Sequence, residues 1–211
     1  MINFIKGCSI QKADELKEEF KIEDNRIVAN VNAEKIKNII FDFIDSQDEE
    51  APLFFFLEVP CNLDEEEIIR EATDKEVGIL KTKRRKVYYL DDISHQMAKE
   101  IINLAGDVLI NDGFAAFGIG NHITNDEIGK DSYNIVNIFY YSNVDKYLKL
   151  LEKNGIVLND NMREAGDIIG PENPGICSIY KDDDGRDIYF VEKFFKENFE
   201  GFYEAEIRDE E

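Results

Sequence analysis

The sequence predicts an α+β fold, in which a mostly antiparallel mixed sheet carries helices packed on one or both faces. Strand and helix patterns alternate through the first part of the chain, and an apolar run marks a central strand. Hairpin signals dominate the last part. This mixture favours an α+β arrangement over a doubly wound parallel sheet.

The first elements are a strand, a helix and the central strand. Residues 26–31 have a strand pattern that ends at Asn32, a suitable N-cap for a helix through Ile44. An acidic loop follows over residues 45–52. Residues 53–57, Leu-Phe-Phe-Phe-Leu, are apolar at consecutive positions, which is typical of a strand covered on both faces.

The middle of the chain continues the alternation. Residues 64–72 open with four acids, which suit the N-terminus of a short helix. Residues 87–90 have a strand pattern. Ser94 is a good N-cap for the clearest helix, whose apolar residues recur at helical spacing over 97–108 before Gly113 ends it.

The next segment predicts an antiparallel strand pair and a helix. Residues 114–119 and 133–141 have strand patterns and are joined by a polar loop, so we expect them to pair. A helix begins at Asn143 and ends at Gly155. Residues 159–175 form an extended surface loop, because Asn, Gly and Pro are frequent there.

The C-terminal part predicts a hairpin and a last helix. Apolar runs at 176–180 and 188–191 flank an Asp-Gly pair, the strongest short hairpin signal. An aromatic helix through Phe199 follows. Without a linker or an internal repeat, we expect a single domain over residues 1–207 and a short charged tail over 208–211.

Charge is the most unusual property of the composition. The chain has 46 Asp and Glu residues against 25 Lys and Arg residues, a formal net charge of -21. Such a surface repels nucleic acid and anionic membranes, and it favours a basic protein partner. The N-terminus lacks a signal-peptide pattern, so we expect a cytoplasmic protein that is not bound to a membrane. The composition leaves the oligomeric state open.

The three cysteines, Cys8, Cys61 and Cys177, are widely spaced, and no two form a C-x-x-C pair. We expect reduced, partly buried thiols.

Two glycines follow a predicted strand and invite comparison with a phosphate-binding loop. Gly118 and Gly120 match the start of G-x-G-x-x-G, but Ile123 replaces the third glycine and no helix pattern follows. We interpret them as a transition from strand to loop. Together with His122 they are the fallback candidates for a ligand site.

The polar loop after this strand contains one histidine and three acids. His122, Asp126, Glu127 and Asp131 could hold a divalent cation if the loop folded back, but their spacing matches no metal motif. We interpret the loop as a solvated segment suited to recognition. The acidic turn 182–187 fails as a calcium loop, because its required first and last ligands are absent. The sequence therefore predicts no metal and no cofactor.

Catalytic patterns are weak. His95 lies between Ser94 and a helix, near two aspartates, but there is no G-x-S-x-G elbow, and a helix-start histidine is the better interpretation. Glu58 belongs to a group of carboxylates near the end of the central strand that could act in acid–base chemistry. The basic run 81–86 pairs with the acidic surface or contacts an acidic patch. The sequence therefore assigns no catalytic residue. We leave open whether the protein is an enzyme, and we favour a binding protein.

The small, acidic, single-domain α+β pattern resembles the immunity proteins of bacterial polymorphic or contact-dependent toxin systems. The resemblance implies a protein that neutralises or sequesters a basic partner by covering it. The candidate contacts are acidic residues in accessible loops: Asp126, Glu127, Asp131, Asp182, Asp183 and Asp184. Two alternatives remain: a small hydrolase or metal-dependent enzyme of unrecognised type, and an acidic interaction domain of a larger assembly.

Overall fold

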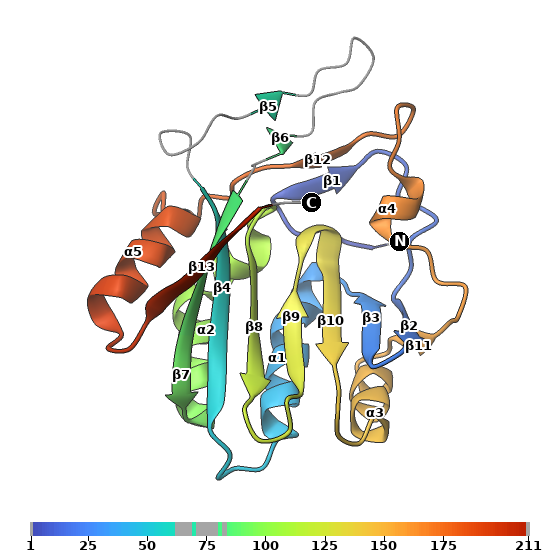
Figure 1. Ribbon diagram of the computed structural model, residues 1–211. Helices are drawn as coiled ribbons and strands as arrows, with labels where there is room; N and C mark the ends of the chain where they lie inside the picture. The colour runs from blue at the N-terminus through green and yellow to red at the C-terminus, as the bar shows by residue number, and fades with distance from the viewer. Residues whose placement is uncertain (1, 62–68, 71–79, 82–83, 210–211) are drawn as a thin grey trace.

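A computed structural model describes residues 2–61, 69–70, 80–81 and 84–209 (Figure 1). The strands are β1 (Cys8–Ile10), β2 (Glu19–Glu23), β3 (Arg26–Asn30), β4 (Leu53–Pro60), β5 (Ile69–Arg70), β6 (Leu80–Lys81), β7 (Arg84–Ile93), β8 (Ala116–Asn121), β9 (Glu127–Lys130), β10 (Ile135–Phe139), β11 (Val157–Leu158), β12 (Gly175–Cys177) and β13 (Tyr203–Asp209). The helices are α1 (Ala33–Asp45), α2 (His95–Asn111), α3 (Asp145–Lys153), α4 (Ala165–Ile168) and α5 (Ile188–Asn198), with a 3-10 turn over Ser132–Asn134.

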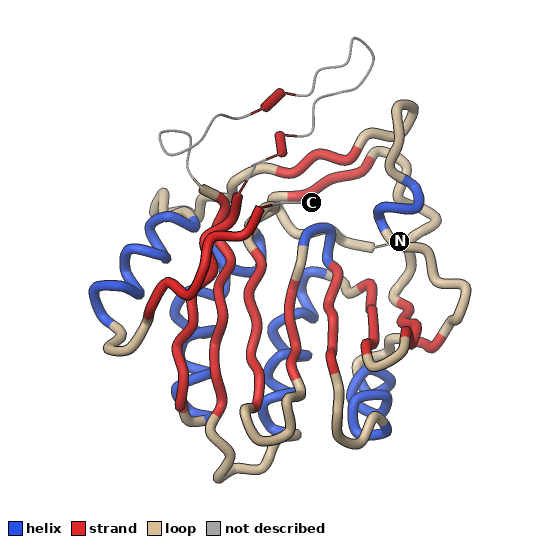
Figure 2. Tube along the Cα trace, viewed as in Figure 1, coloured by secondary structure: helices blue, strands red, loops and turns tan. Residues whose placement is uncertain are grey.

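The predicted α+β class is confirmed. Nine strands form one sheet in the order β11-β2-β3-β10-β9-β8-β4-β7-β13, and every neighbouring pair except β11 with β2 is antiparallel. Helices α1, α2, α3 and α5 all lie against the same face of this sheet (Figures 1 and 2). The main core fills the space between these two layers, and no helix of the described residues lies on the other face of the central strands.

The first two long helices form for the reasons that their sequences indicate. In α1, buried apolar residues recur at helical spacing from Ile36 to Ile44. The predicted cap residue Asn32 precedes α1, but its side chain accepts a hydrogen bond from the Asn3 backbone N–H at 2.7 Å instead of from the helix. Ser94 caps α2 as predicted, because its hydroxyl accepts from the Met97 N–H at 3.1 Å.

The predicted pairing of 114–119 with 133–141 is wrong. Both segments form strands, β8 and β10, but β9 lies between them and pairs with each. The polar loop thus contains a third strand. A short Glu-Ile-Gly-Lys segment has little strand character of its own, and its two ladders of hydrogen bonds fix it in the sheet.

Helices cover only one face of the central strand among the described residues, although both faces were expected to be covered. Helices cover the face that contains Leu53, Phe55 and Leu57, whereas Phe54 and Phe56 lie on the face without helices. The run is apolar at every position because the second face bears aromatic rings.

The predicted C-terminal hairpin does not form. Residues 175–177 form β12, which pairs with β1, and residues 188–191 begin α5. Asp187 starts this helix by accepting a hydrogen bond from the Phe190 N–H at 3.1 Å, and Ile188, Val191 and Phe195 bury one helical face.

The chain continues into a strand that the sequence analysis missed. β13 pairs with β7, so Arg208 and Asp209 belong to the sheet and not to a charged tail. The helix expected over 64–72 lies mostly outside the described residues, and its described part, Ile69–Arg70, is strand β5. Among the described residues, no helix has both the length and the apolar character needed to cross a bilayer.

Candidate functional site

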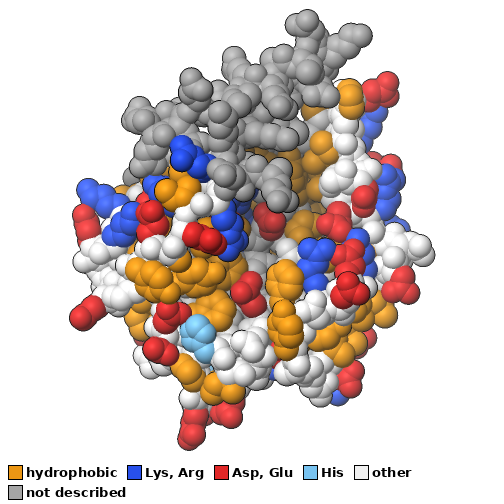
Figure 3. Space-filling model, viewed as in Figure 1, with side chains coloured by type: hydrophobic (Ala, Val, Ile, Leu, Met, Phe, Trp, Pro, Cys, Tyr) orange, Lys and Arg blue, Asp and Glu red, His pale blue; other side chains and the backbone are white. Residues whose placement is uncertain are grey.

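The candidate site is the face of the sheet that the helices leave uncovered, which we call the open face. Alternate residues of β13, β7, β4, β8, β9 and β10 point to it. Figure 3 looks onto this face and shows hydrophobic side chains gathered beside acidic ones over β13, β7 and β4. Two cross-strand rows of residues build its centre.

The first row is aromatic at one end and has glycines in the middle. Tyr203 pairs with Tyr89, Tyr89 with Phe56, and Phe56 with Gly118. The ring centroids lie 6.3 Å apart for Tyr89 and Tyr203 and 6.4 Å apart for Phe56 and Tyr89. The row continues through Gly129 in β9 to Asn137 in β10.

The second row is parallel to the first. Phe54 pairs with Gly120, Gly120 with Glu127, and Glu127 with Phe139. We call Phe54, Phe56, Tyr89 and Tyr203 together the aromatic patch.

The glycines of β8 are required by close ring contacts. A Cβ atom on Gly120 would lie 2.1 Å from Cζ of Phe54, and one on Gly118 would lie 2.4 Å from Cε1 of Phe56. The far ends of the two rings therefore lie over the glycines of β8. The sequence interpretation of these glycines as a transition to a loop is wrong, since both lie inside the strand and provide room for the aromatic patch.

His122 extends the aromatic patch at its edge. Its ring centroid lies 4.7 Å from that of Phe54, and its Nε2 atom lies 2.9 Å from Oδ1 of Asp91. The Tyr203 hydroxyl donates to Oδ2 of the same carboxylate at 2.9 Å. Asp91 thus joins His122 and Tyr203, and the fallback candidates Gly118, Gly120 and His122 all belong to the open face.

Acidic residues lie next to the aromatic patch. Glu58 of β4 accepts a hydrogen bond from Nη1 of Arg208 at 2.9 Å, and Nη1 of Arg85 lies 3.9 Å from its other oxygen. Burial raises the pKa of Glu58, the two arginines lower it, and the nearby Asp131 and Glu206 raise it again, so that it stays above its usual value.

Glu127 differs from Glu58 in having no such partner. Among the described residues, no hydrogen bond or ion pair reaches its carboxylate. Burial, reinforced by the charge of Glu58 and partly offset by Arg208, raises the pKa of Glu127 to about 6. The Phe54 ring lies over Gly120 on one side of it, and Phe139 is its cross-strand neighbour on the other.

A second unsatisfied acceptor lies diagonally from Glu127. Asn137 faces Gly129, two positions along β10 from Phe139. Its Oδ1 atom is buried and has no hydrogen-bond partner in the described part of the chain. Diagonal cross-strand neighbours are close enough for their side chains to contact one ligand. The open face therefore offers two unsatisfied acceptors, one of them anionic, next to aromatic rings.

Asp126 is not part of this surface. Its side chain is fully buried on the helix side, where its Oδ2 atom accepts from the Tyr147 hydroxyl at 2.7 Å and its Oδ1 atom accepts from the Tyr141 N–H at 2.7 Å. Burial alone would raise its pKa, but hydrogen bonds from Ser142, Tyr141 and Tyr147 lower it to about 2. Asp126 is therefore a structural residue that anchors α3, and its selection as an exposed contact is wrong.

The remaining predicted contacts lie in two places. Asp131 is exposed near Glu58, and its carboxylate accepts from the Ser132 N–H at 2.7 Å. Asp182 belongs to a turn next to α2 and α5, and it accepts from the Arg186 N–H at 2.8 Å. Asp183 and Asp184 are exposed in the same turn. The two acidic segments therefore do not form one surface.

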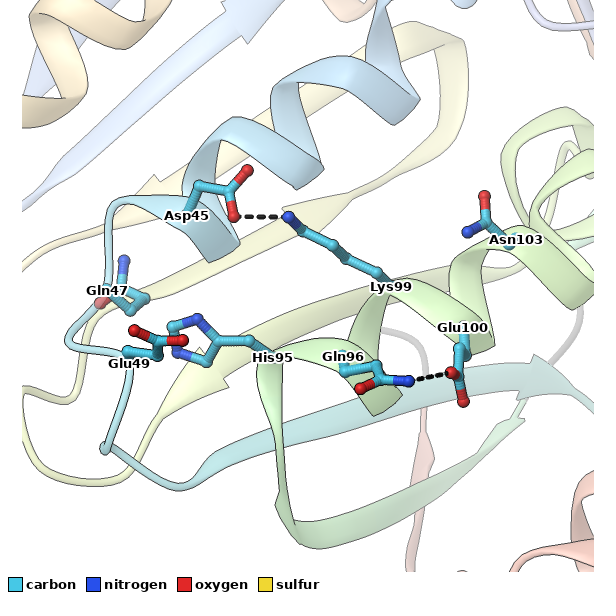
Figure 4. A pocket seen from close by; sticks show the side chains of 8 residues that line it. All are labelled: Asp45, Gln47, Glu49, His95, Gln96, Lys99, Glu100 and Asn103. Carbon is cyan, nitrogen blue, oxygen red and sulfur yellow. Dashed lines mark hydrogen bonds and ion pairs between the residues drawn. The ribbon is translucent and has the colours of Figure 1, made fainter.

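A separate hollow of about 570 Å³ lies between the end of α1 and the start of α2 (Figure 4). His95 and Glu49 both line it, and the Nε2 atom of His95 is buried with no partner in the described segments. Asp45 pairs with Lys99, however, and none of the residues that line the hollow is a serine, threonine or cysteine. The arrangement does not assemble a nucleophile with a base.

No cluster of three or more His, Cys, Asp or Glu side chains suitable for a metal ion occurs among the residues that the structure describes. Comparison of the chain with protein-family models, with curated proteins and with solved structures found no match. The open face is thus interpreted from its own chemistry.

Sequence reasoning missed the aromatic patch as a unit. Phe54 and Phe56 alternate along β4 in the same way as Gly120 and Gly118 along β8, and a large residue opposite a glycine is the signal that pairs them. Tyr203 and Arg208 give no such signal, because the sequence predicts a helix end and a charged tail in this segment.

Proposed function

We propose that the protein is an acidic binding protein that sequesters a basic protein partner on the open face. The partner class implied by the sequence resemblance is a basic toxin. The single observation that carries the proposal is Glu127, a half-buried carboxylate with a pKa raised to about 6 and no hydrogen bond or ion pair to a cation among the described residues.

The chemistry of the site favours a cationic side chain as the group recognised. A carboxylate that is desolvated without a partner costs folding free energy, which a bound lysine or arginine would recover. Asn137 Oδ1 accepts a further hydrogen bond from such a group. The flanking Phe54 and Phe139 rings suit a cation, which interacts favourably with aromatic faces.

The surroundings of Glu127 match the composition of a protein interface. Aromatic residues dominate the energetic centres of interfaces, and charged residues dominate their rims. Here the aromatic patch is central, while Asp131 and Glu206 lie close by on the rim near Glu58. The net charge of -21 would attract a basic partner from a distance.

The test uses synthetic lysine, arginine and glutamate decapeptides as probes, with affinity measured by calorimetry. We expect the two basic peptides to bind and the glutamate peptide not to bind. Glu127→Gln should weaken binding about tenfold, as expected when a charge-assisted hydrogen bond is lost. Asp183→Asn, which removes the same charge from the exposed turn, should change it less than twofold.

Two further readouts locate the site. Amide resonances of Gly118, Gly120 and Gly129 should shift when lysine peptide is added. Binding by the wild type should weaken as the pH falls through about 6, while binding by the Glu127→Gln variant should not. The proposal would be contradicted if the Glu127 and Asp183 variants lost peptide affinity equally, or if only the amide resonances of the 182–184 turn shifted.

A further inference from the structure

Two of the three cysteines face each other across a two-stranded ribbon. In the antiparallel pair β1 and β12, Cys8 lies directly opposite Cys177. The Ser178 N–H donates to the Gly7 carbonyl oxygen at 2.8 Å, so the adjacent residues Gly7 and Ser178 form a hydrogen-bonded pair. The two cysteines therefore form a non-hydrogen-bonded pair, the position of an antiparallel ladder at which opposite side chains are closest. Their Sγ atoms lie 3.3 Å apart.

The surroundings give the two thiols different properties. Cys8 is buried, whereas Cys177 is partly exposed. The hydrogen bond from the Cys8 thiol, together with Tyr133 and the buried Lys130, lowers the pKa of Cys177 despite its burial. The same hydrogen bond and burial raise the pKa of Cys8. The thiolate therefore forms on the less buried of the two cysteines.

We propose that Cys8 and Cys177 form a modification site for low-molecular-weight disulfides, at which the two thiols are oxidised to an intramolecular disulfide. The Cys177 thiolate attacks glutathione disulfide, forms a mixed disulfide and releases one glutathione thiolate. Cys8 gives its proton to solvent and attacks the Cys177 sulfur, which releases the second thiolate. Two protein thiols are oxidised, and one glutathione disulfide is reduced to two glutathione molecules that recover both protons.

Closing the bond requires little movement and changes the stability of the chain. The sulfur atoms must approach by about 1.3 Å, which small side-chain rotations in an opposed pair provide. The bond would link the N-terminal strand to β12 and close most of the chain into a loop. Such a cross-link restricts the unfolded state, so the midpoint of thermal unfolding should rise by about 5 °C or more.

The experiment treats the full chain with glutathione disulfide, blocks the remaining thiols with iodoacetamide and maps the products by mass spectrometry. We expect a single cross-linked peptide pair that contains Cys8 and Cys177, one alkylated cysteine at Cys61, and a higher unfolding midpoint that dithiothreitol reverses.

Variants separate the two steps. Cys8→Ser should stop at a stable glutathione adduct on Cys177, Cys177→Ser should form neither product, and Cys61→Ser should behave as the wild type. The proposal is overturned if the wild type keeps three alkylated cysteines, accumulates the adduct without the cross-link, or links Cys61. The wild-type measurement needs no variant to fold, and none of these outcomes depends on the open face.

Discussion

Asp126 and Glu127 are neighbours in the sequence, and their side chains lie on opposite sides of the sheet. Asp126 points to the helix side, where hydrogen bonds to the charged carboxylate hold its pKa at about 2. Glu127 points to the open face, where burial and Glu58 raise its pKa to about 6. One carboxylate therefore stabilises the fold and the other weakens it, as expected when a binding group is kept ready for a partner.

We expect Glu127→Gln to stabilise the protein. The folded pKa lies above the usual value of 4.5, so ionisation of Glu127 opposes folding at neutral pH. Removing the charge should raise the free energy of unfolding by roughly 1–2 kcal/mol at pH 7.5. The gain should shrink as the pH falls through about 6 and vanish below 4.5. Urea unfolding across this range checks it, with exposed Glu172→Gln as the control.

Asp126→Asn should have the opposite effect. Its folded pKa lies below the usual value of 3.8, so its charge contributes stability that is present above that pH and is lost as the pH falls towards 2. We expect a loss of about 2 kcal/mol at pH 7. Urea unfolding at pH 7 measures this loss, and Asp183→Asn should leave the midpoint unchanged. A stability equal to the wild type would show that the buried network around Tyr147 does not need the charge.

At the scale of elements, the aromatic patch depends on two strands that complement each other. β4 supplies rings at alternate positions, and β8 supplies glycines opposite them. The rings of β4 can occupy these positions only because β8 has no side chains there, since a Cβ atom at Gly118 or Gly120 would overlap a ring. The patch is therefore a property of the register between the two strands.

We expect Gly120→Ala to disrupt this register-dependent packing. The new methyl group would lie 2.1 Å from Cζ of Phe54, so the ring must leave its place beside Glu127. Overpacking of this kind lowers the free energy of unfolding by about 1–3 kcal/mol. Binding of the lysine peptide should weaken as well, because the Phe54 ring is displaced. Gly166→Ala, with no atom within 4 Å of its new Cβ, is the matched control and should weaken neither the stability nor the peptide binding. Unaltered peptide affinity in the Gly120 variant would show that Phe54 does not contribute.

The elements that could be predicted from sequence are those whose signals are local. Helix α2 has its cap at Ser94 and its apolar spacing within one segment, and β4 is marked by its apolar run. The aromatic helix through Phe199 matches the second half of α5. β9 and the start of α5 could not be predicted, since β9 depends on two neighbouring strands and the Asp-Gly turn before α5 also suits a hairpin. For the site, Glu127 could be chosen from the sequence, but its burial and its distinction from Asp126 depend on tertiary structure.

At the scale of the whole molecule, a net charge of -21 and a local carboxylate site act over different distances. The long-range field is screened by salt within about 10 Å at 0.1 M ionic strength, whereas a partly buried contact is screened much less. The field would set how quickly a basic partner arrives, and Glu127 would set how tightly it is held. Salt therefore separates the two contributions.

We expect the affinity for the lysine decapeptide to fall as sodium chloride rises from 0.05 to about 0.5 M, because the field of the whole protein is screened. The roughly tenfold ratio between wild type and Glu127→Gln should persist across this range, since the contact at Glu127 is short and partly desolvated. Asp183→Asn should keep a ratio near one throughout. If the Glu127 ratio instead fell to one at high salt, Glu127 would act only through the overall charge, and the open face would not be a specific site.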